Sequence, residues 1–229
     1  MNLSNRLKAV VDLIDKGDSV CDIGTDHGYI PIYLISEGIS EKVIASDINR
    51  GPIEIARKNL KENGINLEVE TRLGPGLEPI VKGEVNAGVI SGMGGNLIWD
   101  IINESIDKAR EFKYLILQPA QHQEVLRKCL YENGFKVIDE TVVYDANKYY
   151  HNIKVTYEKD IPYEKQVHYY TGRFTLNNPS DDFKGYINRK IESIEKILKS
   201  TNVSNDKDRF NELTYLLEEF RKVREEYEV

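Results

Sequence analysis

Strand-like and helix-like segments alternate along the first two thirds of this chain, and this alternation constrains the fold more than any other feature. Short apolar runs, typical of buried strands, alternate five times with segments of helical periodicity. The predicted strands are 19–23, 42–47, 67–71, 87–91 and 114–117. The predicted helices are 28–37, 51–63, 97–109 and 123–133, preceded by an amphipathic helix over 3–14 that covers an edge. Such alternation predicts a parallel sheet with helices on both faces.

Two more strands, 136–144 and 149–157, follow the last of these helices without a helix between them. They predict an antiparallel hairpin at the end of the sheet. A plain dinucleotide-binding domain does not require such a hairpin, whereas the methyltransferase version of the doubly wound fold ends in this way. We therefore predict an α/β fold: a class I, Rossmann-like methyltransferase domain over residues 1–158. Its seven-stranded sheet is expected to be mostly parallel.

The remaining residues, 159–229, predict a linker and a C-terminal helical hairpin domain. Residues 158–180 contain two prolines and a glycine and are interpreted as the linker. Two heptad-like stripes follow. Their apolar positions are Ile187, Ile191, Ile194 and Leu198, then Leu216, Phe220, Val223 and Tyr227. The hairpin, over about 181–228, has two open interpretations: a dimerisation or capping element, or a lever that grips a large substrate.

Composition narrows the class of protein. The chain has 229 residues, of which 40% are hydrophobic, enough for a full core. It has no apolar run of about 18 residues and no N-terminal secretory signal, and two cysteines cannot form a disulfide framework. We therefore expect no membrane association and a cytoplasmic location. The net charge of −7 argues against an obligate nucleic-acid binder, although it is compatible with a local basic patch.

The loop after the first strand carries the main candidate site, because ligands bind at this edge of a doubly wound sheet. Gly24 permits a tight turn and Gly28 a close backbone approach. Asp26 stands where a dinucleotide fingerprint has its middle glycine, and it would repel a pyrophosphate but attract a sulfonium or ammonium group. This favours S-adenosylmethionine, whose amino group Asp22 can hold. The predicted cofactor contacts here are Asp22, Gly24, Thr25, Asp26, His27 and Gly28.

Two further loops are predicted to hold the adenosine part of this cofactor. Asp47 ends the second strand, where a carboxylate can accept hydrogen bonds from both ribose hydroxyls, and Ile48 can pack against adenine. After the third strand, Pro75 replaces the acid that many methyltransferases have near the adenine amino group, so that contact would come from the backbone. The predicted contacts from these loops are Asp47, Ile48, Asn49, Gly74, Gly76 and Leu77.

The fourth strand ends in a glycine cluster, at the position where the reacting methyl group normally lies. The Asn/Asp-Pro-Pro-Tyr/Phe motif of many enzymes that methylate exocyclic amino groups is absent. Three glycines in four residues let a flat group approach the backbone closely. We assign Ser91, Gly92 and Met93 to the cofactor, and Gly94 and Gly95 to the substrate.

In combination these motifs resemble a known family. The stretch from Asp22 to Tyr29, Ser46-Asp47-Ile48, Gly92-Met93-Gly94-Gly95 and Gln118-Pro119 are similar to the bacterial TrmK-type tRNA (adenine-22-N1)-methyltransferases. That family has a class I methyltransferase domain followed by a coiled-coil-like domain, so the resemblance covers essentially the whole chain. The sequence departs from the family at Pro75 and at Ala120, where an asparagine is expected after Gln-Pro.

The resemblance implies methyl transfer from S-adenosylmethionine to N1 of an adenine in tRNA. We also expect no metal and a monomer or weak dimer. Asp26 is the candidate catalytic residue: it could stabilise the cationic product, orient the adenine amino group or only hold the cofactor. His27 could cap a helix or touch the substrate. The predicted substrate contacts are Arg6, His27, Tyr29, Gly94, Gly95, Gln118 and Pro119.

Two alternatives stay open from the sequence. The chain could methylate a small molecule or a protein, which would suit its acidic charge, or it could be a non-catalytic module that binds the cofactor and RNA. Basic residues do gather on the first helix of the C-terminal hairpin, where they form either an RNA contact or a solvated face. They are Lys184, Arg189, Lys190, Lys196 and Lys199.

Overall fold

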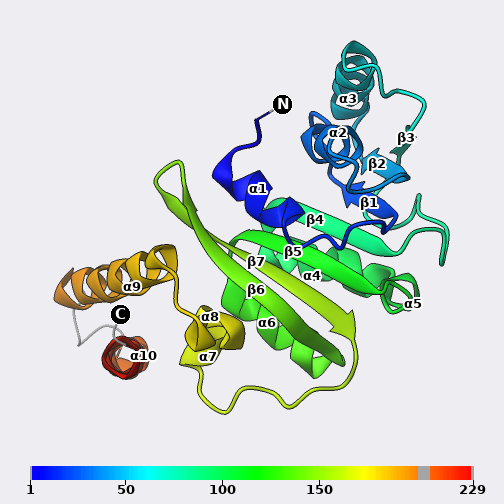
Figure 1. Cartoon of the computed structure of the whole chain (residues 1–229). Coiled ribbons are helices and arrows are strands. Elements are labelled where there is room, and N and C mark those ends of the chain that lie inside the picture. The colour runs from blue at the N-terminus through cyan, green and yellow to red at the C-terminus, as the bar shows by residue number, and fades with distance from the viewer. Residues whose placement is uncertain (1, 201–206, 228–229) are drawn as a thin grey trace.

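The structure of the chain is a computed structural model, which describes residues 2–200 and 207–227 (Figure 1). Its centre is one seven-stranded sheet with the order β3-β2-β1-β4-β5-β7-β6. The strands are β1 (Val20–Ile23), β2 (Val43–Asp47), β3 (Val69–Leu73), β4 (Ala87–Gly94), β5 (Tyr114–Gln121), β6 (Phe135–Asp145) and β7 (Lys148–Tyr157). The first five are parallel, and β7 is antiparallel to both β5 and β6. This confirms the predicted sheet and its terminal hairpin.

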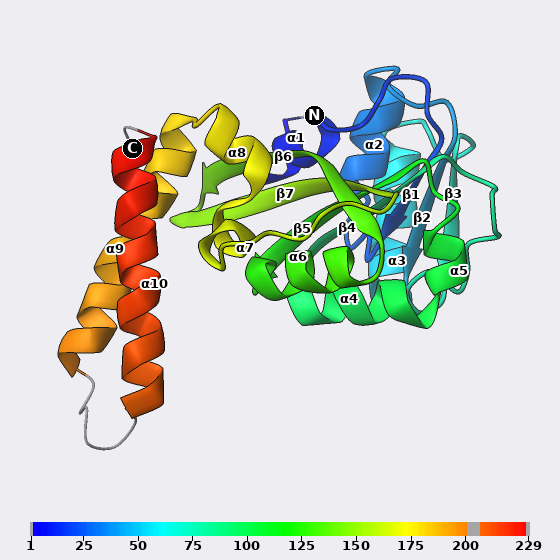
Figure 2. The same ribbon diagram turned by 90° about the horizontal axis from the view of Figure 1, so that it is seen from below.

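Helices cover both faces of the sheet, as Figure 2 shows. They are α1 (Asn5–Val11), α2 (Tyr29–Ser36), α3 (Arg50–Glu62), α4 (Gly95–Glu104), α5 (Ile106–Ala109), α6 (Gln123–Glu132), α7 (Val167–Thr171), α8 (Arg173–Asn177), α9 (Asp181–Ser200) and α10 (Lys207–Glu226). None of the helices that the structure describes is both long and apolar enough to cross a membrane.

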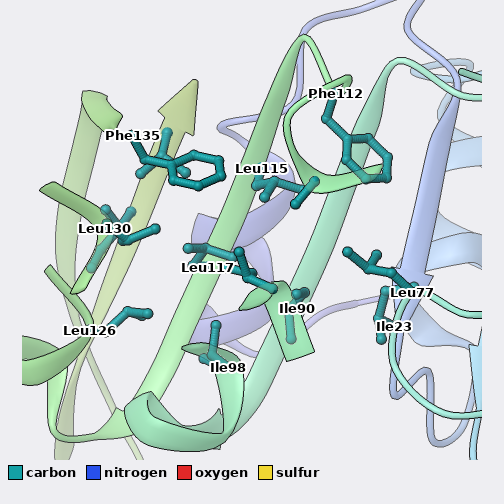
Figure 3. Packing of buried hydrophobic residues seen from close by; sticks show 14 of the residues in the cluster. Ile23, Leu77, Ile90, Ile98, Phe112, Leu115, Leu117, Leu126, Leu130 and Phe135 are labelled. Carbon is teal, nitrogen blue, oxygen red and sulfur yellow. The ribbon is translucent and has the colours of Figure 1, made fainter. Parts of the chain in front are cut away.

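The two faces bury separate apolar clusters. Residues of α4 and α6 pack with Leu115 and Leu117 of β5 on one face (Figure 3). Residues of α1 and α2 pack with Tyr114 and Ile116 of the same strand on the other face. Neighbouring residues of a strand point to opposite faces, so a continuously apolar strand can supply both clusters. This is why the apolar runs in the sequence lack a polar alternation.

Three predicted strands end too early, by two residues or more. The third is Val69–Leu73 rather than 67–71, so it begins and ends two residues later than predicted. The fourth strand continues past residue 91 to Gly94, and the fifth continues past residue 117 to Gln121, with register shifts on both sides of Met93. Pro119 is tolerated inside β5 because the pairing of β5 with β7 ends at Leu117. No hydrogen bond to β7 is therefore lost at the proline nitrogen. The helix predicted over 97–109 is also divided, at Ser105, into α4 and α5.

The segment interpreted as a linker is folded in part. It contains the short helices α7 and α8, and Val167 and Thr171 are fully buried. Arg127 of α6, itself fully buried, donates to the carbonyl oxygens of Tyr169 and Tyr170 and forms an ion pair with Glu140 at 2.8 Å. These contacts fasten the segment to the sheet domain.

The C-terminal helices α9 and α10 pack against each other as the predicted hairpin. Ile187, Ile191 and Ile194 of α9 are buried against Leu216 and Phe220 of α10, so the heptad spacing identified the packed faces correctly. Figure 2 shows the two helices at one end of the sheet, projecting away from it. A division of the chain near residue 158 stays a prediction.

Candidate active site

The predicted cofactor site lies at the carboxyl ends of the strands β1, β2 and β4, under the N-terminal helix. A pocket of about 700 Å³ opens there. It is lined by Asn2, Leu3, Ser4, Arg6, Leu7, Asp22, Gly24, Thr25, Asp26, His27, Tyr29, Ile30, Asp47, Ser91, Gly92 and Met93. Eleven of the residues assigned to cofactor or substrate from the sequence therefore meet in one cavity.

Backbone geometry places the β1–α2 loop across the neighbouring strand. The amides of Gly24 and Thr25 both donate to the carbonyl oxygen of Ser46, at 2.8 and 2.9 Å. Gly24 has a φ of +74°, and a Cβ there would lie 2.3 Å from the Met93 side chain. Gly28 has a φ of +73° and lies against Ala56 of α3, which fits its predicted role in close backbone approach rather than a place in the pocket.

Two carboxyl groups give the floor of the pocket its charge. Asp22 is 2% exposed, and burial raises the pKa of its carboxyl to about 7. The Asp47 carboxylate adds to this rise by repulsion. An ammonium group in the pocket would relieve both effects. The pocket is therefore suited to a ligand that is cationic on the side facing Asp22.

One hydroxyl group of the pocket lining is left without a hydrogen-bond partner. Thr25 Oγ1 is buried and makes no hydrogen bond within the described part of the chain. Ser46 Oγ is also unpaired there, but Ser46 does not line the pocket. Buried polar groups are normally paired, so Thr25 Oγ1 is suited to a polar ligand or water. Asp47 Oδ1 accepts from the amide of Asn49 at 2.8 Å, which leaves its other oxygen for a ligand hydroxyl. Together these groups fit the polar parts of S-adenosylmethionine.

The outer rim of the pocket carries Asp26, His27 and Tyr29. Asp26 holds a positive φ of +50°, uncommon for a residue with a side chain, and its side chain is 69% exposed. His27 Nε2 lies 3.5 Å from Asp26 Oδ2, and the His27 ring stacks on Tyr29 with centroids 5.2 Å apart. The rim therefore offers a carboxylate and two stacked rings to an incoming flat group. The cap role of His27 is not seen, because Gly28 is the N-cap of α2 and no side chain caps it.

Arg6 reaches the pocket from α1 and links it to β5. Its Nη1 donates to Gln118 Oε1 at 2.9 Å, and the same oxygen accepts from the amide of Gly92 at 3.0 Å. The guanidinium also lies over the Tyr150 ring, 5.6 Å from its centroid. Gln118 is fully buried, so it acts as a support for Arg6 and Gly92 behind the pocket wall.

The other assigned residues lie outside the pocket lining. They are Gly28, Ile48, Asn49, Gly74, Gly76, Leu77, Gly94, Gly95, Gln118 and Pro119. Ile48 is 64% exposed beside Asp47, whereas Leu77 is buried in the core. A Cβ at Gly95 would lie 2.2 Å from the carbonyl oxygen of His122, so this glycine permits close packing of the chain on itself. The predicted contact of Gly95 with the substrate stays a prediction, because close packing against His122 already explains a glycine at this position.

Sequence reasoning missed the part of the wall that α1 and its preceding residues form. Asn2, Leu3, Ser4 and Leu7 line the pocket, and Ile30 of α2 does so from the other side. The apolar spacing of Leu3 and Leu7 predicts a helix face that covers an edge, and nothing in that spacing distinguishes a core contact from a pocket wall. Among residues 2–200 and 207–227, no group of three or more His, Cys, Asp or Glu side chains is arranged to hold a metal ion.

Comparison with known proteins agrees with this architecture. Residues 3–153 match the family described as "Methyltransferase domain". The tRNA (adenine(22)-N(1))-methyltransferase of Bacillus subtilis is 38% identical over 150 residues. That alignment covers 66% of this chain and 63% of the relative, so it spans less than two thirds of the curated protein.

Solved structures match over nearly the whole chain. A Streptococcus pneumoniae protein described as a candidate tRNA (m1A22) methyltransferase, in complex with S-adenosyl-L-methionine, is 27% identical with a TM-score of 0.87. The match covers 97% of this chain and 99% of that one. TrmK of M. capricolum, in complex with S-adenosyl-homocysteine, is 28% identical with a TM-score of 0.83, covering 96% of both chains. The C-terminal helices therefore belong to the shared architecture.

Proposed function

The chain belongs to the methyltransferase domain family, and we propose that it transfers a methyl group from S-adenosylmethionine to N1 of an adenine in tRNA, at position 22. The observation that carries this proposal is the pocket that joins Asp22, Asp47 and Asp26 under the N-terminal helix. The likeness to the B. subtilis tRNA (adenine(22)-N(1))-methyltransferase supports the substrate and the position. We expect the enzyme to act in the cytoplasm, without a metal, as a monomer or weak dimer.

Three residues would hold the cofactor. S-adenosylmethionine supplies, when bound, a methyl group on a positively charged sulfur. Asp22 would hold its ammonium group, because a buried carboxylate next to Asp47 is stabilised by a cation. Asp47 would accept hydrogen bonds from the ribose hydroxyls. Thr25 Oγ1 would find a partner there that it lacks in the described part of the chain.

The rim residues would handle the adenine. N1 carries a lone pair at neutral pH, so no strong base is needed to expose it. N1 normally takes part in base pairing or tertiary contacts, so the adenine must leave its stack before it can enter the pocket. The stacked rings of His27 and Tyr29 would receive it, since a flat base packs on aromatic faces.

Asp26 would act on the charge that develops during transfer. The adenine ring becomes cationic when N1 is methylated, and a carboxylate fixed at the rim lowers the free energy of that state. His27 lies close enough to Asp26 to hold it in position. Alignment of the methyl group with N1 supplies most of the remaining acceleration.

The test compares two Asp26 variants with the wild type in methyl transfer to unmodified tRNA. Asp26→Asn keeps the size of the side chain and Asp26→Ala removes it. Both should lower kcat about 100-fold or more, the size typical of losing one electrostatic stabiliser. Cofactor affinity measured by calorimetry should stay within about twofold, because Asp26 lies on the exposed rim.

Asp107→Asn, which removes an exposed carboxylate on α5, is the control and should leave both quantities unchanged. Wild-type activity in both Asp26 variants would show that Asp26 is not catalytic. A loss of cofactor affinity equal to the loss of activity would restrict Asp26 to holding the cofactor.

A further inference from the structure

A second cavity, of about 560 Å³, lies between the sheet domain and the C-terminal hairpin. Residues 120–124 and 147–149 line it from the domain, and side chains of α9 and α10 line it from the hairpin. None of the residues that carry the proposed methyl transfer lines this cavity. We call it the interdomain groove.

The interdomain groove is cationic in a chain whose net charge is −7. The positively charged side chains that line it are Lys148, Arg189, Lys190 and Arg209. Among its described lining residues, Glu124 is the one carboxylate. An excess of positive charge inside a concave surface favours an anionic ligand.

Lys190 is the central cation of the groove. Its Nζ lies 5.4 Å from the ring centroid of Tyr170 and 5.8 Å from that of Tyr186. It forms no ion pair with any carboxylate that the structure describes, and burial lowers the pKa of its ammonium group. The Glu124 carboxylate in the same groove raises this pKa, but by less than burial lowers it. A half-buried ammonium group that lies against two aromatic rings, with no carboxylate in ion-pair contact, can bind a further anion.

His151 adds an unsatisfied donor at the same cavity. Arg127 Nη2 lies 3.1 Å from His151 Nδ1, and because a guanidinium can only donate, Nδ1 must accept. Burial and the Arg127 charge lower the pKa of His151 well below its usual value, so the ring is neutral and carries its proton on Nε2. That buried Nε2 has no hydrogen-bond partner within the described residues. An anion with hydrogen-bond acceptor atoms would therefore suit both the Lys190 ammonium group and the His151 Nε2 donor.

The groove and the methyl-transfer pocket open at the same edge of the sheet. Gly94 at the end of β4 pairs with Gln121 of β5, which lines the groove. The β6–β7 turn lies between the two cavities, since Asp145 accepts from the amide of Arg6 in the pocket wall and Lys148 lines the groove. A polynucleotide whose reactive base enters the pocket can therefore reach the groove with its adjoining backbone.

We propose that the interdomain groove binds a backbone phosphate of the RNA substrate, with Lys190 as the principal contact and Arg189 and Lys148 beside it. This inference rests on the proposed function, because it takes RNA as the substrate. Arg189 Nη1 donates to the carbonyl oxygen of Asn147, at 2.7 Å. A guanidinium has five N–H donors, so the others can donate to the phosphate. The contact is with phosphate, so it fixes the position of the RNA and carries no sequence preference.

The experiment measures tRNA affinity of the full-length protein over a range of salt concentrations. Lys190→Met keeps an aliphatic chain against the two tyrosine rings but removes the charge, and Lys190→Arg restores it. Lys196→Met, at an exposed position of the same helix outside the groove, is the matched control. Lys190→Met should weaken binding about tenfold and reduce the salt slope by about one, whereas the other two variants stay within about twofold.

The outcomes separate this inference from the proposed function. If the wild type binds tRNA and Lys190→Met binds it equally well at all salt concentrations, the groove assignment is overturned and the proposed function stands. If the wild type binds the cofactor but no RNA, both fail. If inorganic phosphate protects the wild type but not Lys190→Met against thermal unfolding, while tRNA affinity is equal in both, the groove is a site for free phosphate and the RNA assignment is overturned.

Discussion

Replacing Asp22 by asparagine tests the electrostatics of the cofactor pocket. Burial raises the pKa of the Asp22 carboxyl from its ordinary value of 3.8 to about 7. Since the folded state holds the proton more tightly than the unfolded state, folding stability rises as pH falls from about 7 toward 3.8. The full difference amounts to about 4 kcal/mol. Above pH 7 the ionised carboxylate destabilises the folded protein by this amount.

The expected result is a difference in pH response between the two proteins. Between about pH 8 and about pH 5.5, this group should contribute about 2 kcal/mol of added stability to the wild type without cofactor. Asp22→Asn should lack that increment, while all other titrating groups contribute equally to both. Urea unfolding at the two pH values measures it, with the exposed Asp107→Asn variant as control. Equal pH responses in wild type and Asp22→Asn would show that folding does not raise the pKa of Asp22.

Cofactor binding should show the opposite trend. If the ionised Asp22 holds the ammonium group, only the fraction of protein with this carboxylate charged is competent to bind. That fraction falls as pH falls below about 7, so the wild-type Kd should increase roughly thirtyfold from about pH 8 to about pH 5.5. In Asp22→Asn affinity should be low and nearly independent of pH. Calorimetric titration with S-adenosylmethionine measures both.

Three further predictions concern stability and binding. Glu140→Gln removes the charge from a fully buried ion pair and should cost about 3–5 kcal/mol in urea unfolding, whereas Glu158→Gln, in an exposed pair, should cost less than about 1 kcal/mol. Gly95→Ala should destabilise the fold by about 1–3 kcal/mol because its Cβ would meet the carbonyl oxygen of His122, whereas Gly51→Ala on α3, with open space around it, should stabilise by up to about 1 kcal/mol in the same assay. Binding of tRNA by the wild type should weaken steeply and log-linearly with salt; a flat response would point to a neutral substrate.

The sequence predicted the sheet well because its strands are short apolar runs separated by helical periodicity. The alternation of strands and helices predicts parallel strands, and the structure confirms that β1 to β5 are parallel, with β1 between β2 and β4. The carboxyl-edge position of Asp22, Asp26 and Asp47 followed directly, since Asp22 and Asp47 are among the last two residues of predicted strands and Asp26 follows one. The sheet and the carboxylates at its edge could therefore be predicted, because the local sequence pattern gives the strands and the parallel topology brings their carboxyl ends together.

What the sequence did not predict depends on contacts between distant segments. The helices α7 and α8 have five residues each, too few for a periodic signal. Both are held through their backbone: buried Arg127 donates to carbonyl oxygens of α7, and Glu140 accepts from the amide of Phe174 in α8. The interdomain groove unites 120–124 with α9 and α10, which lie far apart in the sequence. The basic residues of α9 were visible, but only the packing of the hairpin on the domain distinguishes Lys190, in the groove, from the exposed Lys196.

Product analysis after a single reaction tests methyl transfer to tRNA most directly. The purified protein is incubated with S-adenosylmethionine and unmodified tRNA, the RNA is digested, and its nucleosides are identified by mass spectrometry. The expected product is 1-methyladenosine, mapped to position 22 by sequencing of the intact RNA. Binding of the cofactor without any methylated nucleoside in the tRNA would contradict the proposed methyl transfer.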